Sequence, residues 1–335
     1  MEIRGKMLIF TAIFWTFGEL AVCLIAYIFL DSFSSGNWRA LLLWAAFPAF
    51  ITFFLSLFFL EESPRYLLIF KKYDQAFFLL EKAIKQNNKI ERHTLNEEEK
   101  ESLKTWAEIQ VHFLKNGATG NPVELFREER HKITPLLWII WFVLSCVYYG
   151  NIFILPTVLR NMKMEDEANI NEFLQVFVSV ACELPSSIIA LFIIEIHDLG
   201  RKNSLIITFA LSSISYFISF GLKRMPFLVM ATAARFFLNM SFLIIYPFTT
   251  EIYPTAIRTT GLGISSAFSR IGGISMPWIS IASLKIGKTG PFLIYGILTS
   301  IATISSALIP YDTTGKELDR HKGYQDVEET ISLKE

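Results

Sequence analysis

Long apolar stretches separated by shorter polar ones dominate this chain of 335 residues. Eight stretches reach about 20 residues, which is the length that a helix needs to cross a hydrocarbon core about 30 Å thick. They are residues 7–30, 40–60, 133–159, 172–194, 204–222, 226–250, 259–284 and 291–310. The pattern therefore predicts an all-α membrane protein, a helical bundle with about eight transmembrane helices.

One polar segment, residues 61–132, is much longer than the other connections. A segment of this length usually carries structure of its own. Three amphipathic helices lying along the membrane surface are expected within it. Their markers are the helical spacing of Phe77, Leu80 and Ile84, the capping box Thr94-Leu-Asn-Glu97 ahead of Leu103, Trp106 and Phe113, and the proline of Asn121-Pro122. A solvated linker is the alternative for residues 85–96.

The chain is expected to have four parts. Residues 1–60 hold two spans, 61–132 form the insert, 133–310 hold six spans in one bundle, and 311–335 form a polar tail that is expected to be disordered. Lysine and arginine are denser at the two ends and in the insert than in the connections of the opposite side. The basic-loop rule then places both termini and the insert in the cytosol.

The composition narrows the classes of function. Hydrophobic residues make up 52% of the chain, and its formal net charge is zero. These values exclude a soluble domain and a nucleic-acid-binding protein. Cys23, Cys146 and Cys182 all fall inside predicted spans, so no disulfide framework is expected. The sequence has no Gly-Lys-Ser/Thr phosphate loop, so an ATP-driven pump is not expected. Its histidines and cysteines show no metal-ligand spacing, so no metal site is expected. We also expect that the protein uses no cofactor and is not an enzyme.

Four ionisable residues lie deep in predicted spans, namely Glu19, Glu183, Arg235 and Arg270. Such residues are costly in a bilayer and mark functional sites by default. Arg270 lies near the middle of its span, and a guanidinium stays protonated and binds a carboxylate with two parallel hydrogen bonds. A site for an anionic substrate is one interpretation. A structural arginine, neutralised by an acid or by carbonyls near Gly272-Gly273, is the other.

Glu183 also has two interpretations. It precedes Pro185, whose ring removes a helical hydrogen bond, and a buried carboxyl can exchange a proton during a transport cycle. Alternatively, Glu183 forms an ion pair with Arg235, because both lie in the same six-span bundle and each needs a partner. Glu19 receives no role at this point. Tyr149, beside Tyr148 and close to Asn151, is a candidate cavity residue, with plain packing as the alternative.

Several short motifs resemble those of one family. They are Glu62-Ser63-Pro64-Arg65 after a span, Glu183-Leu184-Pro185 within a span, Gly200-Arg201-Lys202 in a short loop, and Glu251-Ile-Tyr-Pro-Thr-x-x-Arg258 followed by Gly261-x-Gly263. Together they resemble the major facilitator superfamily, and within it the organic ion transporters and the synaptic-vesicle-2-related proteins. The resemblance covers residues 1–315 and matches the fifth to twelfth of the family's twelve spans.

The resemblance implies alternating access around a site between two bundles. Arg270 matches a position where the resembled anion transporters carry arginine and the cation transporters carry aspartate. A small organic ion, with an anion favoured, is therefore the expected substrate, and the plasma membrane or a vesicle is the expected location. The family's first four spans have no counterpart in the chain. We expect an incomplete carrier, or one that has lost transport, and a non-transporting membrane scaffold is the alternative.

The resemblance also implies a cytosolic gate. Its candidate residues are Arg65, Asp198, Gly200, Arg201, Glu251 and Arg258, with Asp312 nearby. Charge pairs there would form in one conformation and separate in another. The alternative is that they are topology signals and helix-end charges. Two departures weaken the match, because His197 occupies the family's aspartate slot and the closing motif survives only as Pro310-Tyr-Asp312-Thr-Thr-Gly315.

Overall fold

The computed structural model describes residues 3–32, 35–87, 94–115, 121–127, 130–162, 172–194, 196, 199–222, 224–253, 255–310 and 312–313. Its backbone contacts divide the chain into two compact units. The first unit holds residues 1–45, 122–254 and 258–318, and the second holds 46–121, 255–257 and 319–335. Each unit is considered by itself.

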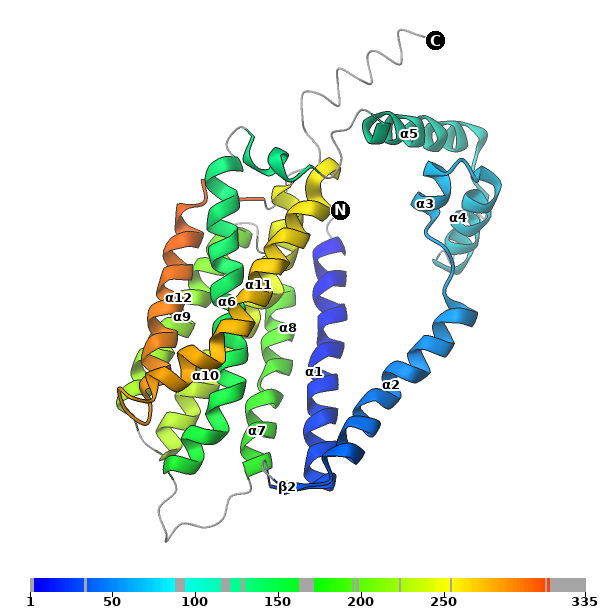
Figure 1. Cartoon of the computed structure of the whole chain (residues 1–335). Coiled ribbons are helices and arrows are strands. Elements are labelled where there is room, and N and C mark those ends of the chain that lie inside the picture. The colour runs from blue at the N-terminus through cyan, green and yellow to red at the C-terminus, as the bar shows by residue number, and fades with distance from the viewer. Residues whose placement is uncertain are drawn as a thin grey trace. The chain divides into compact units, whose positions relative to one another are not determined.

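The first unit is a bundle of long helices (Figure 1). Its helices are α1 (Ile3–Phe29), η1 (Pro122–Phe126), α6 (Arg130–Met162), α7 (Glu172–Ala181), α8 (Glu183–Ile193), α9 (Gly200–Gly221), α10 (Arg224–Ile252), α11 (Thr255–Ser283, apart from residues 255–257) and α12 (Gly290–Leu308). The strands β1 (Leu30–Ser32) and β2 (Ser35–Gly36) pair antiparallel after α1. The helix α2 (Trp38–Phe59) begins in this unit and continues into the second.

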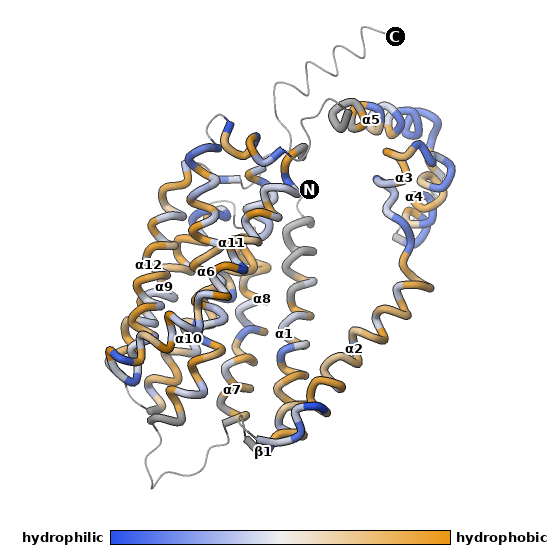
Figure 2. The backbone as a smooth tube through the Cα atoms, in the orientation of Figure 1, coloured by the Kyte–Doolittle hydropathy of each residue, from blue (hydrophilic) through white to orange (hydrophobic). Residues whose placement is uncertain are grey.

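Each of the eight predicted spans coincides with a helix or, for residues 172–194, with the pair α7 and α8. Among the described residues, six helices are both long and apolar enough to cross a membrane, one of them formed by residues 176–193 of α7 and α8 together. The apolar part of α1 is shorter, and α11 is not among the six although it has 29 residues. Apolar colour dominates most of the predicted spans in Figure 2, with hydrophilic positions interrupting α1 and α8 part-way along.

The break between α7 and α8 lies where the sequence predicted a weakened helix. Pro185 has no N–H to donate, and α7 ends at Ala181, two residues before α8 begins at Glu183. Cys182 still donates its N–H to the carbonyl of Val178, so the two helices remain nearly continuous. The break places Glu183 in the first turn of α8, where its side chain is fully buried.

Small polar side chains hold the helices of the first unit together. Ser212 of α9 donates to the carbonyl oxygen of Ala234 on α10 at 3.0 Å. The hydroxyls of Ser213 on α9 and Ser300 on α12 lie 2.7 Å apart. Such residues let backbones approach closely and find hydrogen-bond partners inside the protein, which the absence of water in a bilayer demands. These contacts join α9 to both of its main neighbours.

A glycine sets the spacing between α6 and α11. A Cβ atom built on Gly272 would lie 2.3 Å from the carbonyl oxygen of Phe142. That atom belongs to the backbone of α6 and has little freedom to move. Gly272 therefore lets α11 pack directly against α6, two residues beyond Arg270.

Helix α1 packs against α7, α8 and α10. It therefore belongs to the same compact unit as the six-span region, and the backbone contacts divide α2 at residues 45 and 46. The boundary expected between the first two spans and the insert, at residues 60 and 61, stays a prediction. Of the tail expected at 311–335, only residues 312 and 313 lie within the described part of the chain.

The second unit holds the remainder of α2 with α3 (Pro64–Ile69), α4 (Tyr73–Asn87) and α5 (Glu97–Lys115). Leu67, Leu68, Ala76 and Ala107 form its buried core. The helices α4 and α5 were predicted, whereas α3 was not, because six residues are too few to show a helical period. A solvated linker was the alternative expected for residues 85–96. Residues 85–87 instead form the end of α4, and residues 88–93 lie outside the described residues.

The predicted capping box is wrong by two residues. Asn96, rather than Thr94, precedes α5, and its backbone N–H donates to the carboxylate of Glu99 at 2.9 Å. Glu99 stands three residues after Asn96, which is the spacing that a capping box requires. The third predicted helix is present as η1, and it belongs to the first unit, where Thr134 of α6 donates to the carbonyl of Leu125 at 2.7 Å.

Candidate functional site

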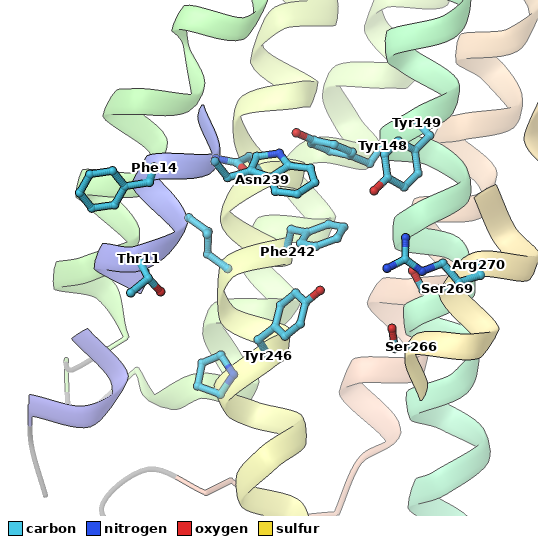
Figure 3. Close-up of a pocket in the computed structure, with 13 residues that line it drawn as sticks. Thr11, Phe14, Tyr148, Tyr149, Asn239, Phe242, Tyr246, Ser266, Ser269 and Arg270 are labelled. Atoms are coloured by element: carbon cyan, nitrogen blue, oxygen red, sulfur yellow. The ribbon is translucent and has the colours of Figure 1, made fainter. Parts of the chain in front are cut away.

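A cavity of about 600 Å³ opens between α1, α6, α10 and α11 of the first unit. This volume lies within the usual range for small-molecule sites, about 300 to 1,000 Å³. Each of the four helices contributes side chains to it (Figure 3). The lining residues are Thr11, Phe14, Trp15, Tyr148, Tyr149, Asn239, Phe242, Leu243, Tyr246, Pro247, Ser266, Ser269 and Arg270.

Among the described residues that line the cavity, Arg270 is the only one with a charged side chain. It occupies the middle of α11, and Figure 3 shows its guanidinium turned toward the same space as the hydroxyls of Tyr149 and Tyr246. Within the described part of the chain, no carboxylate forms an ion pair with Arg270. The arrangement offers one fixed positive charge and nearby hydroxyl donors to a ligand.

Aromatic rings supply much of the remaining wall. Phe14 and Trp15 come from α1, and Phe242 and Tyr246 come from α10. The rings of Phe242 and Tyr246 lie 5.7 Å apart, and Tyr148 packs against Phe242 at 5.4 Å between ring centroids. An apolar or aromatic ligand body would fit against such a wall while its polar group reaches Arg270.

A buried cluster of charges lies behind this wall. Arg235 of α10 donates from Nε to Glu183 Oε1 at 2.7 Å and from Nη2 to Glu19 Oε2 at 2.9 Å. The exposed fraction of the side chain is 2% for Arg235, 0% for Glu183 and 21% for Glu19. The predicted ion pair between Glu183 and Arg235 is thus confirmed. Glu19, which received no role from the sequence, is its third member.

Tyr148 and Trp15 connect the charge cluster to the cavity. The Tyr148 hydroxyl oxygen lies 2.9 and 3.1 Å from the two carboxylate oxygens of Glu183, and 3.1 Å from Glu19 Oε1. Trp15 donates from Nε1 to Glu19 Oε1 at 2.8 Å. The Arg235 guanidinium lies over the Tyr148 ring, 5.6 Å from its centroid. Two cavity-lining side chains therefore touch the cluster directly.

The other candidate residues divide between the cavity and the interior. Tyr149 lines the cavity, as one of its two interpretations expected. Asn151 is buried away from the cavity and donates to the Tyr216 hydroxyl at 3.1 Å, which agrees with packing. Asn239 lines the cavity and donates to Ser186 Oγ at 2.7 Å. Glu183 and Arg235 do not line it.

Charges also meet at the start of α9. Arg201 and Glu251 form an ion pair, and Asp312 accepts hydrogen bonds from the backbone N–H groups of Arg201 and Lys202, each at 3.2 Å. Gly200 has a φ of 67°, a left-handed conformation that other residues adopt only with strain. The glycine thus turns the chain into α9, and the carboxylate of Asp312 sits at the positive end of the helix.

The remaining gate candidates have local contacts. Arg258 donates from Nε to the carbonyl of Tyr253 at 3.3 Å. Arg65 lies in the second unit, with its guanidinium over the Trp106 ring at 5.6 Å from the centroid. Asp198 lies outside the described residues. Of the predicted gate residues, Gly200, Arg201 and Glu251 therefore come together at one helix end.

Comparison with known proteins gives the family. The model of the sugar (and other) transporter family matches residues 1–322, which is nearly the whole chain. The chain belongs to this transporter family. Among relatives, the organic cation/carnitine transporter 7 of Arabidopsis thaliana is 27% identical over 350 residues, covering 94% of this chain and 68% of the relative. The synaptic vesicle 2-related protein of Xenopus laevis is 26% identical over 339 residues, covering 95% of this chain and 58% of the relative.

The fold is that of the major facilitator superfamily. The proton:xylose symporter XylE, bound to 6-bromo-6-deoxy-D-glucose, matches with a TM-score of 0.69 and 21% sequence identity. The match covers 95% of this chain and 66% of XylE. Several relatives that the chain matches are thus longer, and the chain spans 58% of the Xenopus protein. The resemblance to this superfamily, the all-α fold, the multi-pass membrane class and the expectation that the chain is no enzyme are confirmed.

Proposed function

We propose that this member of the transporter family carries a small organic anion across a membrane by alternating access. Family and fold support a carrier. The anionic character of the substrate rests on one observation, which is that Arg270 is the only charged side chain among the described residues that line the cavity. A fixed site between mobile bundles is the general arrangement of such carriers.

The energetics of a membrane arginine favour an anionic ligand. An arginine near the middle of a bilayer costs on the order of 2.5 to 3.5 kcal/mol on insertion scales, and more when nothing compensates its charge. The two acids nearest the cavity are already held by Arg235. A ligand carboxylate would therefore supply the partner that Arg270 has not found among the described residues. The guanidinium can bind that carboxylate with two parallel hydrogen bonds.

The cavity wall supports a substrate with an apolar body. The rings of Phe14, Phe242 and Tyr246 offer flat surfaces, whereas polar groups gather near Arg270 and Ser269. The Arabidopsis relative is named for organic cations and carnitine, which supports an organic ion as the substrate class. The sign of the charge follows from Arg270 alone.

The contacts at the start of α9 support a gate there. The ion pair between Arg201 and Glu251 and the hydrogen bonds to Asp312 join α9, the end of α10 and the segment after α12. Breaking a pair of this kind lets neighbouring helix ends separate, and forming it again closes them. We include this latch, on what would be the cytosolic side, in the proposed cycle.

The test compares an anion and a cation of the same shape. Purified protein in nanodiscs is titrated with 1-naphthoate and with 1-naphthylmethylammonium, and binding is measured by calorimetry. The parent should bind naphthoate and reject the cation. Arg270→Gln should lose at least tenfold in naphthoate affinity, Arg270→Lys should lose less, and Arg270→Asp should lose it altogether and gain affinity for the cation. Lys285→Gln, which removes an exposed charge outside the cavity, is the matched control.

A second measurement separates a carrier from a binding scaffold. Uptake of labelled naphthoate into proteoliposomes should saturate in the parent and disappear in Arg270→Asp. Equal naphthoate affinity in the parent and Arg270→Asp would show that Arg270 is structural, and the anion assignment would be wrong. Binding without uptake would support the scaffold instead.

A further inference from the structure

We infer that Glu19 and Glu183 share one exchangeable proton, held through Arg235 and Tyr148, and that this proton is linked to the occupancy of the cavity. The site is the charge cluster behind the cavity wall. The second part of the inference, which links the proton to anion binding, rests on the proposed function. The first part, the proton site itself, does not.

The first argument is a count of charges. Two carboxylates face a single guanidinium, since Arg235 contacts both Glu19 and Glu183. A cluster with both acids ionised would keep one negative charge without a partner in a largely buried place. Such an unpaired charge is costly in a medium of low dielectric constant, and one bound proton removes it.

The second argument is a count of hydrogens. The Tyr148 hydroxyl has one hydrogen, yet its oxygen lies within 3.1 Å of oxygens from both carboxylates. It can donate that hydrogen to one acid only. The contact with the other acid is a hydrogen bond only if that acid carries a proton and donates it to the tyrosine oxygen. The geometry of Tyr148 therefore fits one protonated and one ionised carboxyl.

The surrounding helices bring few other titratable groups to this place. Helix α1 contributes Glu19 and Cys23, α6 contributes Tyr148, and α10 contributes Arg235. Glu183 opens α8, and Cys182 precedes it, donating from Sγ to the carbonyl of Ser179 at 2.8 Å. The described side chains of α7 include no ionisable group. The two carboxyls are thus the only acids in the described surroundings of Arg235.

The proton reaches the site from the cavity side. Glu19 is the partly exposed member, with 21% of its side chain accessible, whereas Glu183 has none. Trp15 and Tyr148 both line the cavity and both contact Glu19. A solvent proton that adds to a Glu19 carboxylate oxygen forms an O–H group facing Tyr148. No other reactant is needed, and loss of the proton reverses the step.

The sign of the link follows from the charges. The protonated cluster is neutral and the deprotonated one is negative, so an anion beside Arg270 is bound more tightly when the proton is present. By linkage, binding of the anion then favours uptake of the proton to the same extent. Proton and anion would move together.

Infrared difference spectroscopy tests the proton site without any ligand. A protonated carboxyl has its own carbonyl stretching band, and spectra of the parent recorded across a pH series should show one such band that titrates. Glu19→Gln and Glu183→Gln should each abolish it, because the remaining carboxylate then pairs with Arg235. Glu108→Gln, on the exposed face of α5, should leave it unchanged. Tyr148→Phe should keep the band at a shifted frequency, because the carboxyl loses its hydrogen-bond partner.

Several results would overturn the inference. If the parent shows no titrating carboxyl band, both acids are ionised and no proton is shared. If the band survives in one of the two glutamine variants, the proton belongs to a single acid. For the link, naphthoate affinity of the parent should fall at least fivefold as the proton leaves, and in Glu19→Gln it should not depend on pH. If naphthoate fails to bind at all, the proposed function fails, while the infrared band still decides the proton site.

Discussion

Removal of the guanidinium of Arg235 should destabilise the protein far more than removal of the Glu183 carboxylate. The two partners of the ion pair are not equivalent, because Arg235 also binds Glu19. Arg235→Gln leaves two carboxylates facing each other without a cation. Glu183→Gln leaves Arg235 with Glu19 at 2.9 Å, and the new amide oxygen can still accept the hydrogen of Nε.

The magnitudes follow from this difference. Breaking a buried ion pair from one side costs about 3 to 5 kcal/mol, and we expect Arg235→Gln in this range. Glu183→Gln weakens one charge-assisted hydrogen bond, which costs on the order of 1 kcal/mol. The cost of Glu183→Gln is smaller still if Glu183 is the acid that carries the shared proton. The double variant keeps only Glu19, which is partly exposed, so its loss should be smaller than that of Arg235→Gln alone.

The free energy of unfolding is measured by titration with sodium dodecyl sulfate in mixed micelles, followed by tryptophan fluorescence. Lys285→Gln is the control, because Lys285 is exposed in the connection between α11 and α12; we expect a change below about 0.5 kcal/mol. Two results would refute the reasoning. One is equal destabilisation by Glu183→Gln and Arg235→Gln, and the other is a double variant whose loss equals the sum of the single losses.

Two further predictions concern packing and topology. Gly272→Ala should lower the free energy of unfolding by about 1 to 3 kcal/mol in the same titration, because its methyl group would meet the backbone of Phe142. Gly263→Ala is the control and should be neutral or stabilising, because its methyl group meets nothing within 4 Å. Equal effects of the two substitutions would show that α6 and α11 do not pack as described. Single cysteines that replace Lys104 and Lys285 should react with an impermeant thiol reagent from opposite faces of sealed vesicles, as the basic-loop rule expects. Labelling of both positions from the outside would overturn the predicted topology.

The chain's elements could be read from the sequence because a membrane imposes a length on every apolar helix. All eight predicted spans are helices, and their ends agree within a few residues. The weakening of the helix near Pro185 was likewise predicted, since it depends on the missing N–H of one residue, whereas the left-handed conformation of Gly200 was not predicted. Helix α3 and the start of α5 were missed or misplaced, because short helices and competing caps carry weaker local signals.

The arrangement of the charges was only partly visible. Two acids and two arginines lie deep in the spans, so the sequence allowed more than one pairing. It favoured Glu183 with Arg235, which the structure confirms at 2.7 Å, but it left Glu19 without a role. Only the tertiary structure places α1 against α8 and α10, brings Glu19 to Arg235, and leaves Arg270 facing the cavity.

The physical reason lies in the composition of the helices. A helix that is hydrophobic on all sides has no amphipathic stripe, so the sequence fixes its length but not the direction in which it faces. The rotation of each helix is decided by packing against its neighbours, through contacts such as Gly272 on Phe142 and Ser213 on Ser300. The number of spans and their deep charges were therefore determined by the sequence, whereas the cavity, its aromatic wall and the three-membered charge cluster were decided by the packed fold.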